Sequence, residues 1–363
     1  MFSSSVRRRI IIVTTALACL VAADIGVRRA EPVLRTYDVA LYEKTIEELL
    51  HRGVPDIVLM GSSRAKYALV PEQFSAVTGR PAYNVAIAGS KTVEWQLLAR
   101  RLFEGRRPKL VVLGINASEL RADYLPSPAA RHLFTFDDLC EHLRRDHPST
   151  EVVGNYLRHS LGPAWAAFDR RYELKMSLQE GLGDFLPKHA QEARELRQRV
   201  ARPSPPDGYD HPWLRGRHRP TLDDQLVADE AQVVRASTPL FSPRAEAFSH
   251  LSDLLDWLHA RRIELIVAYI PNSPATENRW RDVEPAMVEI IASICRDHGV
   301  PFLPCSQADV PRSNRDFIEE VHVGLPLARQ ISGRIARHIL ALGLLQDRTQ
   351  QFAGTDRLDR AVP

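Results

Sequence analysis

The chain has 363 residues, of which 44% are hydrophobic and 26% are charged. This composition is typical of a globular core rather than of a disordered chain. The formal net charge is only +3, and five arginines lie among the first 29 residues, so the remainder of the chain is close to neutral. The sequence has no basic stripe suited to a phosphate backbone, which argues against nucleic acid as a partner.

An apolar segment at residues 10–27 follows Arg7-Arg8-Arg9 and is interrupted only by Asp24. At about 18 residues it is at the short end of what spans a bilayer. The arginines are expected to stay cytoplasmic, which puts the bulk of the chain outside the cytoplasmic membrane. We therefore predict a membrane anchor over residues 1–30. A cleaved signal, a weak lipobox at Leu17-Ala18-Cys19 and a buried soluble helix stay open as alternatives.

Three short apolar runs in the first third of the chain each end at a glycine. Between the last two runs, residues 91–104 have the pattern of a helix. The order strand, helix, strand predicts a parallel sheet covered on both faces. The runs are residues 56–60 before Gly61, residues 83–88 before Gly89 and residues 109–113 before Gly114.

This rhythm breaks over residues 121–240, which we interpret as a helical and loop insertion. Charged helix-like segments lie near 136–146 and 188–200, and the prolines and glycines of 202–220 predict a loop. The α/β pattern then returns with predicted elements at 243–262 (helix), 263–270 (strand), 279–298 (helix), 300–304 (strand) and 326–343 (helix).

We thus expect one α/β domain over residues 55–345 that contains the insertion. Near-helical spacing of apolar residues at 37–52 predicts a lead-in helix within residues 31–54. The polar tail at 346–363 is expected to be disordered.

The four cysteines form no CxxC motif, so the sequence predicts neither a zinc site nor a redox motif. Cys295 and Cys305 lie where a disulfide is conceivable if a helix packs on the next strand. His132, His142 and His147 lack a metal-ligand spacing. We expect no metal and no cofactor.

Polar residues follow two of the predicted strands, and a third group precedes the closing helix. They are Gly61-Ser62-Ser63-Arg64, Gly114-Ile115-Asn116 and Glu319-Glu320-Val321-His322. In an open parallel sheet, ligands bind beyond the carboxyl ends of the strands. The sequence therefore places candidate chemistry at that edge.

These segments resemble the motifs of the SGNH/GDSL hydrolases. Gly-Ser-Ser is similar to Gly-Asp-Ser with Ser63 as nucleophile, and Gly89 stands where the family has its second glycine. Gly-Ile-Asn is similar to Gly-x-Asn with Asn116, and Glu-Glu-Val-His is similar to the terminal Asp-x-x-His with Glu319 and His322. The resemblance covers roughly residues 55–120 and 243–343. It implies a three-layer flavodoxin-like sandwich with a mostly parallel sheet.

The roles follow from the chemistry of acyl transfer. A serine hydroxyl needs a base within hydrogen-bond reach, and histidine supplies one near neutral pH. A carboxylate that accepts a hydrogen bond from the other ring nitrogen fixes the tautomer of the histidine. We assign this role to Glu319. The oxyanion donors are expected to be the backbone N–H groups of Ser63 and Gly89 and the side-chain amide of Asn116.

Several alternatives stay open at this point. Ser63 suits a helix cap, and Asn116 suits a turn. Glu320 and Asp316 compete with Glu319 for the acid role. We interpret Arg64 as an exposed arginine that holds a surface carboxylate rather than as a ligand for an anionic substrate.

The sequence departs from the family at three positions. Ser62 and Ala117 stand where the family has aspartates, and Glu319 is longer than the usual aspartate. These changes resemble membrane-anchored proteins of cell-surface polysaccharide O-acetylation. The resemblance implies a serine esterase or O-acyltransferase acting on a cell-envelope or exported polysaccharide, with a membrane protein as possible acyl donor. A degenerate glycan- or partner-binding module and a secreted esterase are the alternatives.

Overall fold

The computed structural model divides the chain into two compact units, Met1–Lys44 with Pro128–Pro203 and Thr45–Ser127 with Ser204–Pro363. The second unit holds the sheet and all the candidate site residues. The structure describes residues 4–34, 53–120, 135–144, 246–319 and 321–345, and isolated positions at 44, 47, 48, 51, 133, 153, 154, 157, 165 and 209.

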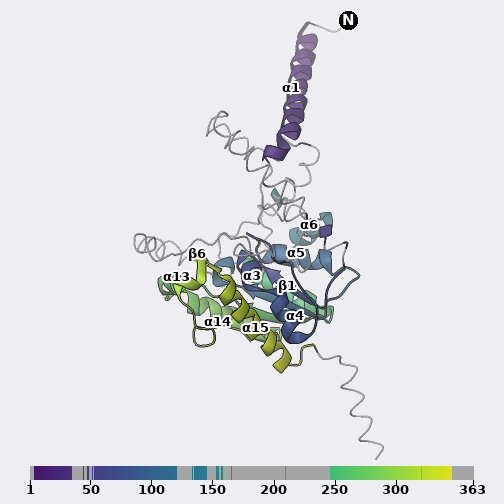
Figure 1. The fold of residues 1–363 in the computed structure, drawn as a ribbon. Coiled ribbons are helices and arrows are strands. Elements are labelled where there is room, and N and C mark those ends of the chain that lie inside the picture. Colours follow the sequence, from purple (N-terminus) through teal and green to yellow (C-terminus); the bar gives the residue numbers. More distant parts are fainter. Residues whose placement is uncertain are drawn as a thin grey trace, which may run out of the picture. The chain divides into compact units, whose positions relative to one another are not determined.

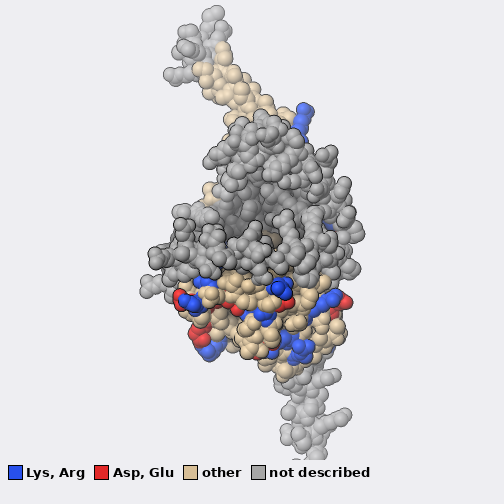
Figure 2. Space-filling view, turned by 60° about the vertical axis from the view of Figure 1, so that its left-hand side comes forward, with Lys and Arg blue, Asp and Glu red and all other residues tan. Residues whose placement is uncertain are grey.

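The N-terminal apolar segment forms one long helix, α1 (Ser4–Leu34). Its most apolar part, Ile11–Arg29, spans 19 residues with a mean hydropathy of 1.9. At 1.5 Å rise per residue this part is about 28 Å long, close to the thickness of a bilayer core. Few charged side chains are visible on the described part of α1 (Figure 2). One of its basic residues, Arg28, pairs with Asp24. The helix is therefore long and apolar enough for an anchor or a signal sequence.

Several predicted segments lie outside the described residues. These are most of the lead-in helix, of which positions 44, 47, 48 and 51 are helical, the helix at 188–200, the loop at 202–220 and the tail at 346–363. Within the insertion, α6 (Phe136–Leu143) forms inside the predicted segment 136–146.

Five parallel strands form the central sheet in the order β2-β1-β3-β4-β5, which confirms the predicted parallel sheet. This order belongs to the doubly wound α/β sheets, whose ligand crevice lies where the strand order reverses. Here the reversal falls between β1 and β3. The strands are β1 (Ile57–Gly61), β2 (Ala82–Asn84), β3 (Leu110–Ile115), β4 (Glu264–Tyr269) and β5 (Phe302–Leu303).

Strand β2 is shorter than the predicted run at 83–88. The Asn84 side-chain oxygen accepts a hydrogen bond from the N–H of Ala86 at 2.9 Å, a local turn that ends regular pairing. Val85 and Ile87 still donate to the carbonyls of Leu59 and Gly61, so the chain continues along β1 without forming a strand.

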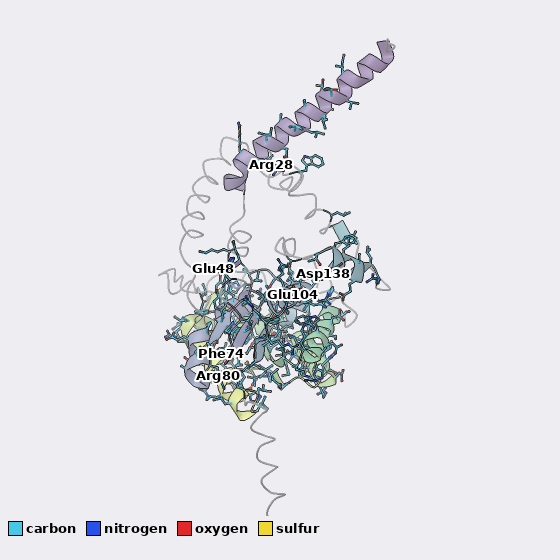
Figure 3. All side chains as sticks on the ribbon, turned by 90° about the vertical axis from the view of Figure 1, so that its right-hand side faces the viewer. Arg28, Glu48, Phe74, Arg80, Glu104 and Asp138 are labelled. Atoms are coloured by element: carbon cyan, nitrogen blue, oxygen red, sulfur yellow. The ribbon has the colours of Figure 1, made fainter. Side chains whose placement is uncertain are left out.

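Helices cover both faces of the sheet. On one face, α4 (Pro71–Thr78) and α15 (Leu325–Ala341) pack side by side, with α3 (Ser63–Ala68) between β1 and α15 (Figure 1). Phe74 of α4, labelled in Figure 3, is fully buried in this layer with the alternate residues of β1, β3 and β4. On the other face, α5 (Thr92–Leu102) packs against α12 (Glu246–Ala260).

The predicted helix at 279–298 forms as α14 (Glu284–Asp297), whereas residues 279 and 280 belong to a separate helix, α13 (Pro274–Trp280), which corrects the start of the prediction. The second residue of α14 is Pro285, which lacks a backbone N–H and whose ring excludes the preceding helical turn. A helix can begin at such a residue but cannot run through it without a kink.

The conceivable disulfide between Cys295 and Cys305 does not form, because both cysteines are free. Burial raises the pKa of each of these thiols to about 12. Both sulfurs therefore stay protonated near neutral pH and behave as small apolar groups of the core.

Candidate active site

The turn after β1 presents Ser63 at the carboxyl edge of the sheet. Ser62, not Ser63, caps α3, because its Oγ accepts a hydrogen bond from the N–H of Arg64 at 3.2 Å. Ser63 is the first residue of the helix and is half-buried. Because Ser62 supplies the cap, the Ser63 hydroxyl is not used in capping. Its backbone N–H lies in the first turn, where helical N–H groups have no partner within the helix.

Gly61 makes this turn possible. It has φ of +140°, and a Cβ built on it would lie 2.3 Å from the carbonyl oxygen of Gly114 and 2.5 Å from the Cβ of Ala65. No side chain fits between these neighbours. The close approach holds the end of β1 against the end of β3, where Gly61 and Gly114 are directly paired.

His322 reaches Ser63 from the far end of the chain. Its Nε2 lies 2.8 Å from Ser63 Oγ, although the two residues are 259 positions apart. The imidazole is half-buried, and the ring of Tyr67 on α3 meets it edge-on with centroids 4.8 Å apart. The distance suits proton transfer from the serine hydroxyl to a neutral imidazole.

A small hairpin carries this histidine. Strands β6 (Phe317–Glu319) and β7 (His322–Val323) pair in antiparallel register, with Glu319 directly opposite His322. The N–H of Gly324 donates to the carbonyl of Asp316 at 2.6 Å and closes the hairpin. The backbone therefore places Glu319 beside His322. The Glu319 side chain lies outside the described part of the chain, so its acid role stays a prediction.

Of the two competitors for that role, the structure describes only Asp316. The carboxylate of Asp316 accepts hydrogen bonds from the N–H and the hydroxyl of Ser313, at 2.7 and 2.9 Å. It therefore closes the short 3-10 helix at Asn314–Asp316 rather than facing the imidazole. Glu320 lies outside the described residues.

Asn116 follows β3 as predicted, but its side chain faces the interior. The residue is fully buried, and its Nδ2 donates to the carbonyl of Ile270 at 2.8 Å and to the hydroxyl of Tyr269 at 3.2 Å. Its Oδ1 accepts from the N–H of Ser118, which forms the turn that the sequence left open as an alternative. The structure thus engages both amide hydrogens away from Ser63.

Gly89 lies in the exposed turn after β2, with φ of +76°. The next residue, Ser90, is buried and fixes this turn to the sheet. Its Oγ shares its proton between the carbonyls of Ile87 at 2.7 Å and Gly61 at 3.1 Å, and accepts from the indole N–H of Trp95 at 2.8 Å. The predicted oxyanion glycine therefore belongs to a loop tied to the strand end that precedes Ser63.

A buried carboxylate that the sequence interpretation missed lies behind the site. Glu119 accepts hydrogen bonds from the hydroxyl of Ser62 and, at 2.9 Å, from the backbone N–H of Asn116. Burial raises the pKa of Glu119, and the positive charges of Arg64 and Lys91 partly oppose that rise. An acidic residue three positions after Asn116, at the end of a buried strand, was the only sequence signal for it.

Arg64 is buried rather than on the surface, which corrects the sequence interpretation. Its guanidinium donates to Asn272 Oδ1, and the Asn272 amide donates to Glu284 at 3.0 Å. The Tyr269 hydroxyl donates to the same carboxylate, and burial together with Glu284 raises the pKa of Tyr269. A continuous polar network thus runs from Arg64 beside Ser63 to Asn116.

Comparison with protein-family models and with curated proteins finds no match to this chain. Among the described residues, no group of three or more His, Cys, Asp or Glu side chains is arranged to hold a metal ion. The chemistry that the described residues offer is a serine hydroxyl in contact with an imidazole.

Proposed function

We propose that this chain is a serine-dependent acyl ester hydrolase or O-acyltransferase of the SGNH type. The observation that carries the proposal is the contact of 2.8 Å between His322 Nε2 and Ser63 Oγ. A serine hydroxyl is a weak nucleophile until a base accepts its proton. Ser63 follows β1 at the point where the strand order reverses, and doubly wound sheets bind their ligands at this point.

The reaction has two steps with the same base. Ser63 Oγ attacks the carbonyl carbon of an acyl ester while its proton passes to His322 Nε2, and the leaving alcohol takes that proton as the ester bond breaks. Water or a sugar hydroxyl then attacks the acyl-serine, gives its proton to Nε2, and the acid or the new ester leaves as the proton returns to Ser63 Oγ. The backbone N–H groups of Ser63 and Gly89 are the proposed donors to the oxyanion.

The proposed substrate is a cell-envelope or exported polysaccharide, a class implied by the resemblance of Gly61-Ser62-Ser63 and Glu319–His322 to the SGNH motifs. We place the domain outside the cytoplasmic membrane, held by α1, because the arginines at positions 7–9 favour the cytoplasmic side. A membrane protein is the proposed acyl donor for transfer. With α1 cleaved as a signal, the same site would belong to a secreted esterase.

One observation favours a second candidate, a degenerate SGNH-type module that binds glycan or a partner. The amide of Asn116 donates to Ile270 and Tyr269 and so is withheld from the oxyanion. Loss of one oxyanion donor typically lowers kcat by about 10²–10³-fold.

A fluorophosphonate probe separates the two candidates, because it reacts with an activated serine whatever the natural substrate. We expect it to label the full-length chain at Ser63, and Ser63→Ala and His322→Ala to abolish labelling. Ser293→Ala on α14 and His259→Ala on α12 are matched controls distant in sequence from the site motifs and should be labelled normally. A folded wild-type chain that the probe does not label would refute the enzyme and support the binding module.

A further inference from the structure

One buried carboxylate joins the two strand ends of the candidate site. Glu119 is only 4% exposed, its Oε1 accepts from the Ser62 hydroxyl, and its Oε2 accepts from the N–H of Asn116 at 2.9 Å. We propose that Glu119 is a positioning residue for Ser63, which acts by fixing the turn after β1 against the turn after β3. This inference rests on the proposed function and assigns a residue outside the four motifs that suggested it.

The path from Glu119 to Ser63 is short. Ser62 directly precedes the nucleophile, and its hydroxyl has two simultaneous partners: it donates to Glu119 and accepts from the N–H of Arg64 at 3.2 Å. With the proton directed to Glu119, a lone pair of Ser62 Oγ is free for the Arg64 N–H. The carboxylate therefore sets the rotamer of the residue that caps α3, and the first turn of α3 sets the position of Ser63.

The other carboxylate oxygen acts on β3. The N–H of Asn116 is buried at the end of this strand, where the chain turns into the 3-10 helix at Ala117–Leu120. Since Glu119 belongs to this same helix, its bond to Asn116 closes the turn and fixes the carboxylate itself. The result is a rigid link between the β1 and β3 ends, beyond the point where Gly61 and Gly114 pair.

The surroundings show why this carboxylate is retained although burial opposes its charge. A buried carboxylate is tolerated when hydrogen bonds and opposite charges compensate the loss of water. Glu119 has two hydrogen bonds and the nearby positive charges of Arg64 and Lys91. Hydrogen bonds to a charged acceptor are roughly twice as strong as neutral ones. The link is therefore stiff enough to hold a reacting group, where a misplacement of about 1 Å can cost about 10²-fold in rate.

The test measures the kinetics of fluorophosphonate labelling on the folded full-length chain, with the maximal rate and the half-saturating probe concentration taken separately. We expect Glu119→Ala to lower the maximal rate about 10²-fold and to leave the half-saturating concentration nearly unchanged, because the nucleophile is misplaced while the probe still binds. Glu119→Gln keeps the size of the side chain and one acceptor oxygen, but its NH2 group cannot accept the second hydrogen bond, so we expect an intermediate loss of about tenfold. Glu104→Ala, at an exposed position labelled in Figure 3, is the matched control and should label as wild type.

A double-mutant cycle with Ser62→Ala tests the path. If Glu119 acts through Ser62, adding Glu119→Ala to Ser62→Ala lowers the rate by much less than it does in the wild type. Full multiplication of the two effects would overturn the proposal, and so would a Glu119→Ala chain that melts earlier but labels at the wild-type rate. Should Glu119→Ala fail to fold, Glu119→Gln takes its place in the cycle, and its tenfold effect must shrink in the Ser62→Ala background. A wild-type chain without labelling overturns the proposed function itself, whereas normal labelling of the Glu119 variants overturns only this role.

Discussion

Replacing Gly61 by alanine tests the central packing of the site. The new Cβ would lie 2.3 Å from the Gly114 carbonyl oxygen and 2.5 Å from Ala65 Cβ. Both neighbours are fixed, one in the backbone of β3 and the other in the first turns of α3, so the strand ends must separate. An overpacked buried position costs about 1–3 kcal/mol. A side chain held at φ of +140° adds about 1–3 kcal/mol of backbone strain.

The expected destabilisation is therefore about 2–6 kcal/mol, a large part of the roughly 5–15 kcal/mol that a native domain has in total. Gly79→Ala is the matched control: Gly79 also has a positive φ, of +69°, but nothing lies within 4 Å of its added Cβ. Only the conformational cost of about 1–2 kcal/mol should remain there. Urea unfolding of both variants in the same detergent measures the difference.

The two glycine variants also differ in their expected effect on chemistry. Separation of the β1 and β3 ends moves the turn that carries Ser63, so Gly61→Ala should slow fluorophosphonate labelling of the fraction that remains folded. Gly79→Ala, at the end of α4, should label as wild type. Equal unfolding midpoints for the two variants would refute the packing argument.

Three further predictions concern charge and location. Because burial raises the pKa of Glu119 above 4.5, the folded chain binds that proton more tightly than the unfolded chain, so this contribution is complete at lower pH and is lost as pH rises through the folded pKa. The melting temperature of the wild type relative to Glu119→Gln should therefore fall as pH rises from 4.5 to the folded pKa, and a pH-independent difference would contradict this prediction. Arg312→Ala should cost about 1–3 kcal/mol in urea unfolding, because buried Arg312 donates to the carbonyls of Cys305 and Val310 and to the carboxylate of Glu277. Exposed Arg329→Ala should change it by less than about 0.5 kcal/mol. Deletion of residues 1–34 should move the chain from the membrane fraction to the soluble fraction, and retention in the membrane would exclude α1 as the anchor.

Much of the sheet could be predicted because its strands have strong local signals. The strands β1 and β3 are apolar along their whole length, and β4 is apolar after its first residue, Glu264, as expected for strands buried on both faces. Element ends were less certain where one side chain decides them, as Asn84 ends β2 and Pro285 separates α13 from α14. The strand order itself depends on long-range pairing, which no local pattern contains.

The candidate site, too, could be predicted only in part from the sequence. The sequence order of motifs predicted that Ser63 and His322 meet, since strand ends and the loop before the last helix converge in such folds, and the structure brings these two side chains together. The burial of Arg64 and Glu119 could not be predicted, because charged residues are usually exposed and their compensation comes from residues far apart in sequence. The inward direction of the Asn116 amide likewise depends on Tyr269 and Ile270, more than 150 positions away.

The span of 259 positions between Ser63 and His322 has a consequence for biosynthesis. A chain emerging N-terminus first displays Ser63 long before the hairpin of β6 and β7 exists, so in the proposed mechanism the hydroxyl has no base during synthesis. In that mechanism, reactivity requires the segment 317–345 to dock, because this segment holds the hairpin and α15, which packs against α3 and α4. Proteolytic loss of the segment after residue 316 would accordingly leave a chain that keeps its whole sheet and has no base for its serine.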